Sequence, residues 1–294
     1  EDLKQLMLIN TSGGITSGDE YNYDIEIEKS NLCISTQAAE KIYSGFGNSA
    51  NLEINLNLLN NSSLFWLPKE LILFNNCNLK RKINLNLSKD SNLLLCENII
   101  FGRTSMNETF EKGYFSDFWN INIDKKLIHT EAINTGLFEK KYLNSFSTLN
   151  NNSAVATIII VGNKFLNNVN NLSETLTNNE NTTSNYSHWD NKLIHTEAIN
   201  TSLFEKKYLN SFSTLNNNSA VATIIIIGNK FLNNVDNLSK TLTNNENTTS
   251  NYSNWDNKLI VRLLSKDSYN LKFAIDKILS YFFEGSKIPK IWNI

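Results

Sequence analysis

The sequence predicts a protein made mostly of β-strands that stack into sheets, and three observations favour this class. Apolar and polar residues alternate with period two in several segments, these segments recur about every 30 residues, and Asn, Ser and Gly residues separate them. Such alternation places one row of side chains in a core and the other row in water. Many short strands of this kind are compatible with a sandwich, a barrel or a solenoid.

Each alternating segment is expected to be a half-buried strand, and short apolar runs between these segments add further strands. The longest apolar run, Ala154–Val161, has the length of a strand and falls short of the roughly 18 residues that a membrane span needs. In chain order, the alternating segments are residues 23–28, 52–58, 82–87 and 118–124, and the shorter apolar runs are residues 32–35, 71–74 and 93–96.

Helical periodicity predicts about two α-helices. Apolar residues recur at helical spacing over residues 267–283, where Asp267 or Ser268 can cap the start and Gly285 follows the end. A weaker pattern covers residues 164–176. The C-terminal helix is expected to pack its apolar stripe against the sheet.

Composition argues against several kinds of site and partner. The 27 basic and 29 acidic side chains are mixed along the chain and give a net charge of −2, which is unlike a protein that binds nucleic acid or an anionic membrane. Cys33, Cys77 and Cys96 lie far apart without Cys-x-x-Cys spacing, so each is expected to be a small buried residue. We find no signal peptide and expect a cytoplasmic protein.

Residues 126–191 are followed directly by a near-identical copy, residues 192–257, in which 61 of 66 positions are the same. Structural repeats normally keep core positions while their surface diverges, whereas here even the surface is retained. The pattern indicates a recent duplication or an assembly artefact within a single domain that spans residues 1–294. The sheet could absorb a whole copy in register, but we expect the two copies to compete for one position, which would expose one apolar segment.

The opening segment, residues 8–20, reads LINTSGGITSGDE and predicts a tight turn. Gly13, Gly14 and Gly18 allow a positive φ and close backbone approach, and the turn ends in the carboxylates Asp19 and Glu20. It lacks the Gly-Lys-Ser/Thr of a phosphate loop and leads into an alternating strand, so it is not a nucleotide-binding turn. Taken alone, it is more typical of a glycine-rich hairpin with solvated acids than of a functional site.

Six separate motifs follow one another along the chain. Their types and their order resemble the UreD (UreH) family of urease accessory proteins, and the resemblance runs from about residue 8 to residue 294. The motifs are GGxxxGD at 13–19, TQAAxKxY at 36–43, WLPxExxLF at 66–74, FGR at 101–103, VRLL at 261–264 and IPKIW at 288–292.

The resemblance implies stacked β-sheets in a β-helix-like arrangement with a pair of helices. It also implies a protein that is not an enzyme. Such a protein docks on apo-urease and, with UreF and the GTPase UreG, delivers nickel through a water-filled passage. No cofactor would be held stably, nickel would be in transit, and GTP would enter only through the partner GTPase.

Two features depart from the family pattern. Family members usually have some tens of residues before the glycine turn, whereas only seven residues precede Leu8, so an incomplete product is expected. The segment Leu-Ile-His-Thr-Glu-Ala occurs once in the family and twice here, so one copy is expected to be surplus.

By position in the motifs, the resemblance implies that Asp19, Glu20, Glu131 and its duplicate Glu197 line the nickel passage. A borderline divalent metal in transit suits carboxylates that bind weakly enough to release it. The alternative for each is a turn cap or a solvated strand face. His129 and its duplicate His195 share a strand face with these glutamates, but they are expected to be bystanders because the family position is usually apolar.

The other motif residues are expected to be structural. Glu40 is the polar position of its motif, and Arg103 and Glu70 can form a buried charge pair only if the fold brings them together. Arg262 interrupts an apolar strand and is expected to point outward or to find a carboxylate. The remaining motif positions are the prolines Pro68 and Pro289 and the expected anchors Trp66 and Trp292.

Two other functions stay open from the residues alone. One is a carbohydrate-active hydrolase or lyase on a β-helix, with Asp19, Glu20 and Glu131 as acid and base. The other is a generic β-rich binding module. Binding to UreF and apo-urease would favour the accessory role, turnover the hydrolase, and glycan binding the module.

Overall fold

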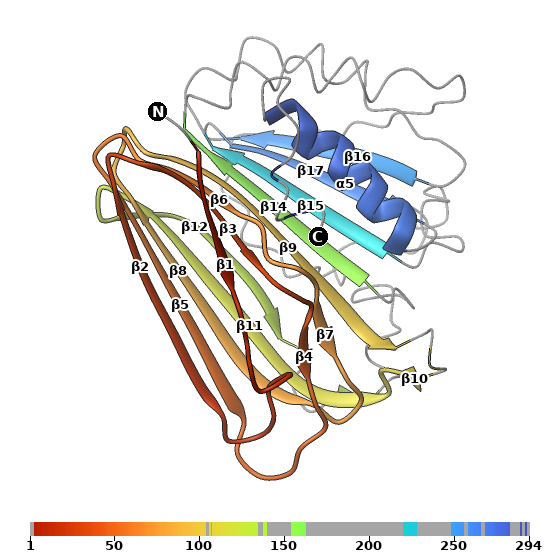
Figure 1. The fold of residues 1–294 in the computed structure, drawn as a ribbon. Helices are drawn as coiled ribbons and strands as arrows, with labels where there is room; N and C mark the ends of the chain where they lie inside the picture. The colour runs from red at the N-terminus through yellow and green to blue at the C-terminus, as the bar shows by residue number, and fades with distance from the viewer. Residues whose placement is uncertain are drawn as a thin grey trace.

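The computed structural model describes residues 3–103, 106, 108–134, 138–139, 154–162, 220–227, 248–255, 258–265, 268–282, 289 and 292. Two sheets lie face to face, and one α-helix covers the outer side of the larger sheet (Figure 1). The described residues are therefore mostly β-structure, as the sequence predicts. Among them, no helix is both long enough and apolar enough to cross a bilayer.

The larger sheet has the strand order β1-β3-β6-β9-β14-β15-β17-β16, with β4, β7 and β10 beside this path, and the smaller sheet has the order β12-β11-β8-β5-β2, with β13 beside β11. The strands are β1 Lys4–Leu8, β2 Glu20–Glu28, β3 Asn31–Thr36, β4 Glu40–Ile42, β5 Ala50–Leu59, β6 Ser63–Trp66, β7 Leu71–Leu73, β8 Asn78–Leu87, β9 Asn92–Arg103, β10 Glu108–Thr109, β11 Lys112–Ile123, β12 Lys126–Asn134, β13 Phe138–Glu139, β14 Ala154–Val161, β15 Ala220–Ile227, β16 Thr248–Trp255 and β17 Lys258–Ser265.

The chain alternates between the sheets, so that each circuit adds one strand to the smaller sheet and one or two strands to the larger sheet. Strands β2, β5 and β8 are followed by β3, β6 and β9, and neighbouring circuits are parallel and in register. Asp24 therefore lies beside Asn55, 31 residues later, and Asn55 beside Asn84, a further 29 residues on. This arrangement resembles a β-solenoid and confirms the interval that the sequence predicts.

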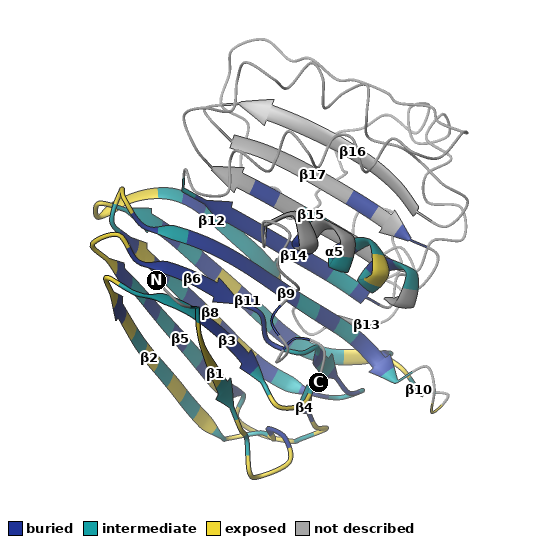
Figure 2. Cartoon of the chain, turned by 45° about the horizontal axis from the view of Figure 1, so that its top comes forward, coloured by how far each residue is buried: buried dark blue, intermediate teal, exposed yellow. Residues whose placement is uncertain are grey.

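Side-chain alternation along each strand separates the core from the outer face. In β5, Leu52, Ile54, Leu56 and Leu58 point inward and are buried, and each contributes roughly 1.5–3 kcal/mol by leaving water. Figure 2 shows buried residues along β9 and alternating exposed residues along β2. The core therefore lies between the two sheets.

The abundant asparagines form ladders on the outer face of the smaller sheet. Asn84 Nδ2 donates to Asn55 Oδ1 at 2.7 Å, and Asn86 Nδ2 donates to Asn57 Oδ1 at 2.9 Å. Asn122 Nδ2 continues the second row by donating to Asn86 Oδ1 at 3.0 Å. Because the parallel strands are in register, equal side chains stack and satisfy one another, much as in other Asn ladders.

The two copies of the duplicated segment each place a strand in the larger sheet. β14 from the first copy and β15 from the second are parallel and in register, between β9 and β17. The sheet is thus extended by one strand and holds both, which matches the alternative of absorption in register. Competition between the whole copies stays a prediction.

Helix α5 spans Ser268–Phe282 and confirms the C-terminal helix. It contacts β15, β16 and β17, and its residues Leu271, Ile275 and Leu279 are buried. The second expected helix, at residues 164–176, lies outside the described residues. Cys33, Cys77 and Cys96 are free and buried, as expected.

Candidate functional site

Four of the six motifs lie on successive circuits of the solenoid, at the same corner of the larger sheet. The glycine turn pairs with β4 through a bridge between Ile15 and Ile42, and β4 pairs with β7. β7 in turn pairs with β9 in a register that places Leu73 beside Phe101 of FGR. Motifs separated by about 30 residues thus form one continuous column.

The corner is held by hydrogen bonds between equivalent positions. Thr36 Oγ1 accepts a hydrogen bond from Lys69 N at 2.9 Å, and Glu40 N donates to Glu70 O at 2.9 Å. The TQAA bend therefore stacks on the bend that contains Pro68. Both motifs therefore form bends of the solenoid at this corner.

The glycine turn needs its glycines for different reasons. Gly13 and Gly18 have φ values of 78° and 85°, in the region that favours glycine. A Cβ on Gly14 would lie 2.4 Å from Tyr43 Cε2 and 2.7 Å from the Lys41 carbonyl oxygen. Only glycine lets the turn lie this close to β4.

The adjacent carboxylates of the turn have different surroundings. Asp19 Oδ2 accepts a hydrogen bond from Thr16 N at 2.8 Å, so Asp19 closes the turn in the manner of a cap. Glu20 begins β2 on its outer, exposed row. Both positions match the structural alternative, and their contact with nickel stays a prediction.

Glu40 is the half-buried acid of this corner. Its Oε1 accepts a hydrogen bond from Asn10 Nδ2 at 2.9 Å, and burial raises its pKa above the ordinary value despite that bond. Burial, followed by the charge of Glu40, also raises the pKa of Tyr23. The carboxyl group of Glu40 thus lies on the inner side of the first circuit.

Arg103 and Glu70 do not pair with each other, so the fold does not form the charge pair that the sequence left open. Arg103 pairs with Glu108, and its guanidinium lies 4.1 Å from the centre of the Phe74 ring. Glu70 Oε1 lies 3.2 Å from Lys272 Nζ of α5. Arg103 and Glu70 therefore each form an ion pair with a different residue.

The C-terminal motif joins the column from more than 200 residues away. Pro289 and Trp292 are buried, and Trp292 Nε1 donates to Asp276 Oδ1 of α5 at 2.8 Å. Lys69 Nζ donates to the carbonyl oxygen of Trp292. Trp292 is therefore the anchor that the sequence predicts, and it ties the end of the chain to the second circuit.

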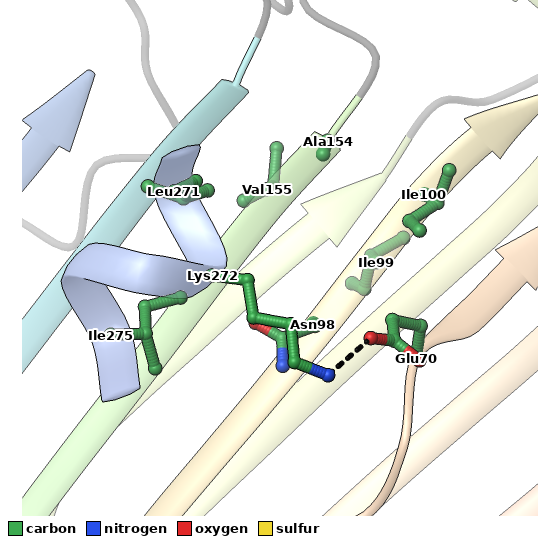
Figure 3. A pocket seen from close by; sticks show the side chains of 9 residues that line it. All are labelled: Glu70, Asn98, Ile99, Ile100, Ala154, Val155, Leu271, Lys272 and Ile275. Atoms are coloured by element: carbon green, nitrogen blue, oxygen red, sulfur yellow. Dashed lines mark hydrogen bonds and ion pairs between the residues drawn. The ribbon is translucent and has the colours of Figure 1, made fainter. Parts of the chain in front are cut away.

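A cavity of about 250 Å³ lies between α5 and the larger sheet, with Lys272 and Glu70 at one side (Figure 3). Its walls are otherwise mostly apolar, from Ile99, Ile100 and Leu271. This cavity belongs to the packing of α5.

The sequence reasoning missed an ionic cluster at the centre of the interior. Arg81 of β8 makes two hydrogen bonds to Asp117 of β11, Nε to Oδ1 at 2.8 Å and Nη2 to Oδ2 at 2.6 Å. Its Nη1 donates to Glu97 of β9 at 2.6 Å, and Trp66 Nε1 donates to the other oxygen of Glu97 at 2.7 Å. The cluster thus joins the two sheets.

All three charged side chains of this cluster are at most 4% exposed. Burial alone would lower the pKa of Arg81, but Asp117 and Glu97 raise it above its ordinary value, so the guanidinium stays charged. With two carboxylates and one guanidinium, the cluster has a formal charge of −1. Trp66, expected to be an anchor, is the neutral donor that completes it.

Period-two alternation could have located this cluster. Arg81 shares the inward parity of Ile83 and Leu85, and Glu97 shares that of Leu93 and Leu95. A charged residue on an inward row of a strand should therefore be examined for a partner on the facing sheet.

Glu131 and His129 lie on the inner face of β12, beside the cluster. Glu131 is opposite Trp119 in the antiparallel pair, and His129 is opposite the buried Ile121, so all four share one face. His129 Nε2 lies 3.5 Å from Glu131 Oε2, and the Trp119 ring lies 5.7 Å from the Arg81 guanidinium. His129 and Glu131 thus share an inner face with Trp119, and Trp119 contacts Arg81.

The duplicates Glu197 and His195 lie outside the described residues. Arg262 is on β17, in register with Asn251 and Thr223, and its side chain lies outside the described residues. Among the described residues, no three His, Cys, Asp or Glu side chains gather as a set that could hold a metal ion.

The fold and the site together place the chain among β-solenoid-like proteins whose interior contains a buried ionic cluster. The sequence model of the UreD urease accessory protein family matches residues 1–196, and the chain belongs to this family.

Relatives from several bacteria are similar over part of the chain. A urease accessory protein UreD of Rhodopseudomonas palustris is 43% identical over 128 residues, which cover 43% of this chain and 46% of the relative. UreD 1 of Brucella anthropi is 35% identical over 165 residues, covering 54% of this chain and 58% of the relative. The matches thus span about half the length of these relatives.

Proposed function

We propose that this chain is a scaffold that docks on apo-urease and, together with UreF and UreG, passes nickel towards the urease active site. The observation that carries this proposal is the presence of two groups of polar side chains on the inner faces of the sheets, Glu131 with His129 and Arg81 with its two carboxylates, within a family of urease accessory proteins. An inner route lets a cation move without release into bulk water, where other ligands compete for it.

Glu131 and His129 support such a route because a carboxylate and an imidazole are both ligands that nickel accepts. The side chain of Glu131 is 21% exposed and that of His129 is 8% exposed, so a cation could reach the carboxylate from solvent while the imidazole is nearly buried. Two donors hold a cation weakly, which suits an ion that must move on. Glu197 would offer the same carboxylate from the second copy.

Arg81 supports the route in a different way. Two buried carboxylates without a cation would bind a divalent ion tightly, and Arg81 already pairs with both Glu97 and Asp117. The deepest carboxylates are thus satisfied, while Glu131 is left to interact with a passing ion. Nickel is the cargo in this proposal, and no stably bound cofactor is needed.

Asp19 and Glu20 are proposed to act where the cation arrives. Their carboxylates stand at the start of an edge strand whose outer row also carries Asp24, Glu26 and Glu28. Such a row raises the local concentration of cations by electrostatic attraction. The free cysteines fit a reducing compartment, so the cytoplasm is the proposed place of action.

Co-expression with apo-urease, UreF and UreG tests the proposal. After nickel is added, urease activity is compared for the unchanged chain and for the double variant Glu131→Gln, Glu197→Gln, which removes the acid from both copies. We expect activity to fall at least about tenfold while pull-down of the partners is unchanged. The control is Glu53→Gln on the outer face, which should leave activity unchanged.

A second comparison uses a variant that lacks residues 192–257. Activation by both forms would mean that the fold tolerates the second copy, and activation by the shortened form alone would make that copy a lesion. Failure of the full chain to bind apo-urease and UreF would overturn the proposal. Full activity of the double variant would exclude the glutamates as part of the route.

A further inference from the structure

The contact between β14 and β15 joins two copies of the same sequence. The strands are parallel, and each residue lies opposite its own duplicate, from Ala154 beside Ala220 to Val161 beside Ile227. Only this last position differs between the two segments. The contact inside one chain is thus made between two nearly equal partners.

This contact also separates two parts of the chain. On one side, β14 pairs with β9 and completes the solenoid that begins at β1. On the other side, β15 pairs with β17, which carries β16, and α5 packs over these strands. The C-terminal unit, defined as β15, β16, β17 and α5, therefore meets the sheet through β15.

We propose that the chain associates with a second copy of itself by exchanging this C-terminal unit. In the exchanged dimer, β15 of each chain pairs with β14 of the other in the same parallel register. The sheet of each half is then the sheet of the single chain. Association by this route is independent of the role in urease maturation.

Three properties of the strands favour a second copy as the occupant. The segments are self-complementary, because every position except Val161 beside Ile227 lies opposite the same residue type. All the described residues of β14 except Val155 are buried, so the segment needs a neighbour on both edges. The strand has no charged residue that would discourage parallel pairing with its own kind.

The energetics depend on the connection between the two strands. Contacts are equal in the closed chain and in the exchanged dimer, so connection length and protein concentration decide between them. Residues 162–219 separate β14 from β15 in the sequence. Two chains must meet for the exchange, so the exchanged dimer gains over the closed chain as protein concentration rises.

The C-terminal anchor can also be preserved in the dimer. Lys69 contacts Trp292 and Glu70 contacts Lys272, and both contacts join the solenoid to the C-terminal part of the chain. When the whole C-terminal unit is exchanged together with Trp292, each contact forms between chains. Exchange therefore loses none of these interactions.

Engineered disulfides in the full chain test the proposal. Thr157 and Thr223 are opposite each other in the register, so Thr157→Cys is placed in a chain with one tag and Thr223→Cys in a chain with another. The chains are unfolded, mixed, refolded at high concentration and oxidised. We expect a disulfide-linked species of twice the 33.5 kDa chain mass that carries both tags.

Matched controls separate exchange from unspecific association. Refolding the Thr157→Cys chain alone should give no linked dimer, because an exchanged dimer never brings two copies of residue 157 together. The unchanged protein, whose cysteines are buried, should also stay unlinked. A linked dimer from Thr157→Cys alone would indicate β14 pairing with β14 and would overturn the proposed exchange.

A second measurement follows the mass of the chain by light scattering as concentration rises. The full chain is expected to form a dimer, whereas the variant lacking residues 192–257, which has only one copy of the duplicated strand, should stay a monomer. Equal dimerisation of both forms would contradict the proposal. If the shortened variant does not fold, the disulfide experiment decides, and absence of a two-tag species at every concentration overturns the exchange.

Discussion

Arg81 of the smaller sheet and Glu97 of the larger sheet meet in the interior, with 2.6 Å between Nη1 and Oε2. Asp117 holds the same guanidinium from the neighbouring strand. Removing such charges from water is costly, and good geometry with further hydrogen bonds is needed to offset that cost. The cluster therefore fixes how the two sheets face each other, since a shift of one strand would leave a charge unpaired.

Replacing Arg81 by Met tests this role. The change leaves the carboxylates of Glu97 and Asp117 buried without their cation, and removal of one partner from a buried pair destabilises by about 3–5 kcal/mol. Urea unfolding followed by circular dichroism measures the loss. The matched control is Lys82→Met, the next residue on the same strand.

Lys82 is exposed and lies 3.8 Å from an exposed Glu53, so its replacement should cost no more than about 1 kcal/mol. Similar losses for the two variants would show that the buried cluster is not important for stability.

Glu40→Gln tests the effect of burial on a carboxyl group. Burial raises the pKa of Glu40 in the folded protein above its ordinary value of 4.5. The folded state therefore binds this proton more tightly, so the contribution of Glu40 is most favourable at low pH and is lost as pH rises through the folded pKa. We expect the variant to be more stable than the unchanged protein near pH 7, and the difference to vanish near pH 4.

Unfolding midpoints in urea across this pH range measure the difference. Glu26→Gln on the exposed row of β2 is the control and should show a smaller pH-dependent difference. A Glu40→Gln variant that is less stable near neutral pH would show that the hydrogen bond from Asn10 outweighs burial.

The sequence predicted the strands well because alternation is a local property. Residues 52–58 of β5 and the run Ala154–Val161 carry their burial pattern in the sequence itself. The pairing of β14 with β15 could not be predicted in this way, because it depends on whether the sheet has room for one more strand. That outcome is decided by contacts between segments far apart in the chain.

The site was predicted less well for a related reason. The motifs pointed to Arg103 and Glu70 as charged residues that need partners. Their partners, Glu108 and Lys272, became evident only from the register of the corner and the position of α5. The buried Arg81 belongs to none of the six motifs. Its inward parity was visible in the sequence, whereas the facing Glu97 required the stacking of the sheets.

Gly14→Ala should be more harmful than Gly13→Ala. A side chain at residue 13 meets no atom within 4 Å, so this variant loses only the roughly 1–2 kcal/mol of a left-handed conformation. At residue 14 the new Cβ would also meet the Lys41 carbonyl oxygen at 2.7 Å, and a backbone oxygen cannot move away easily. Thermal unfolding of both variants gives the comparison, and equal losses would contradict the close approach of the turn to β4.

The three thiols should be unreactive in the folded protein. Burial raises the pKa of Cys33 and of Cys77 to about 12, and it also raises that of Cys96, so little thiolate forms near pH 8. A maleimide reagent and mass spectrometry should find no labelled chain in native buffer and three labels in urea. Rapid labelling of any cysteine without denaturant would show that the interior opens.

Trp292→Ala should release α5 from the solenoid. Trp292 is 1% exposed, its indole donates to Asp276, and its carbonyl oxygen accepts from Lys69. Loss of a buried tryptophan costs about 3–5 kcal/mol, and here that loss falls on the contact between the chain end and the second circuit. Hydrogen exchange should therefore become faster in α5 and stay unchanged in β5, which lies in the other sheet.

Trp292→Phe keeps most of the packing but removes the donor to Asp276, so it should show an intermediate effect. Unchanged exchange in α5 after Trp292→Ala would mean that the apolar contacts of Leu271, Ile275 and Leu279 hold the helix by themselves.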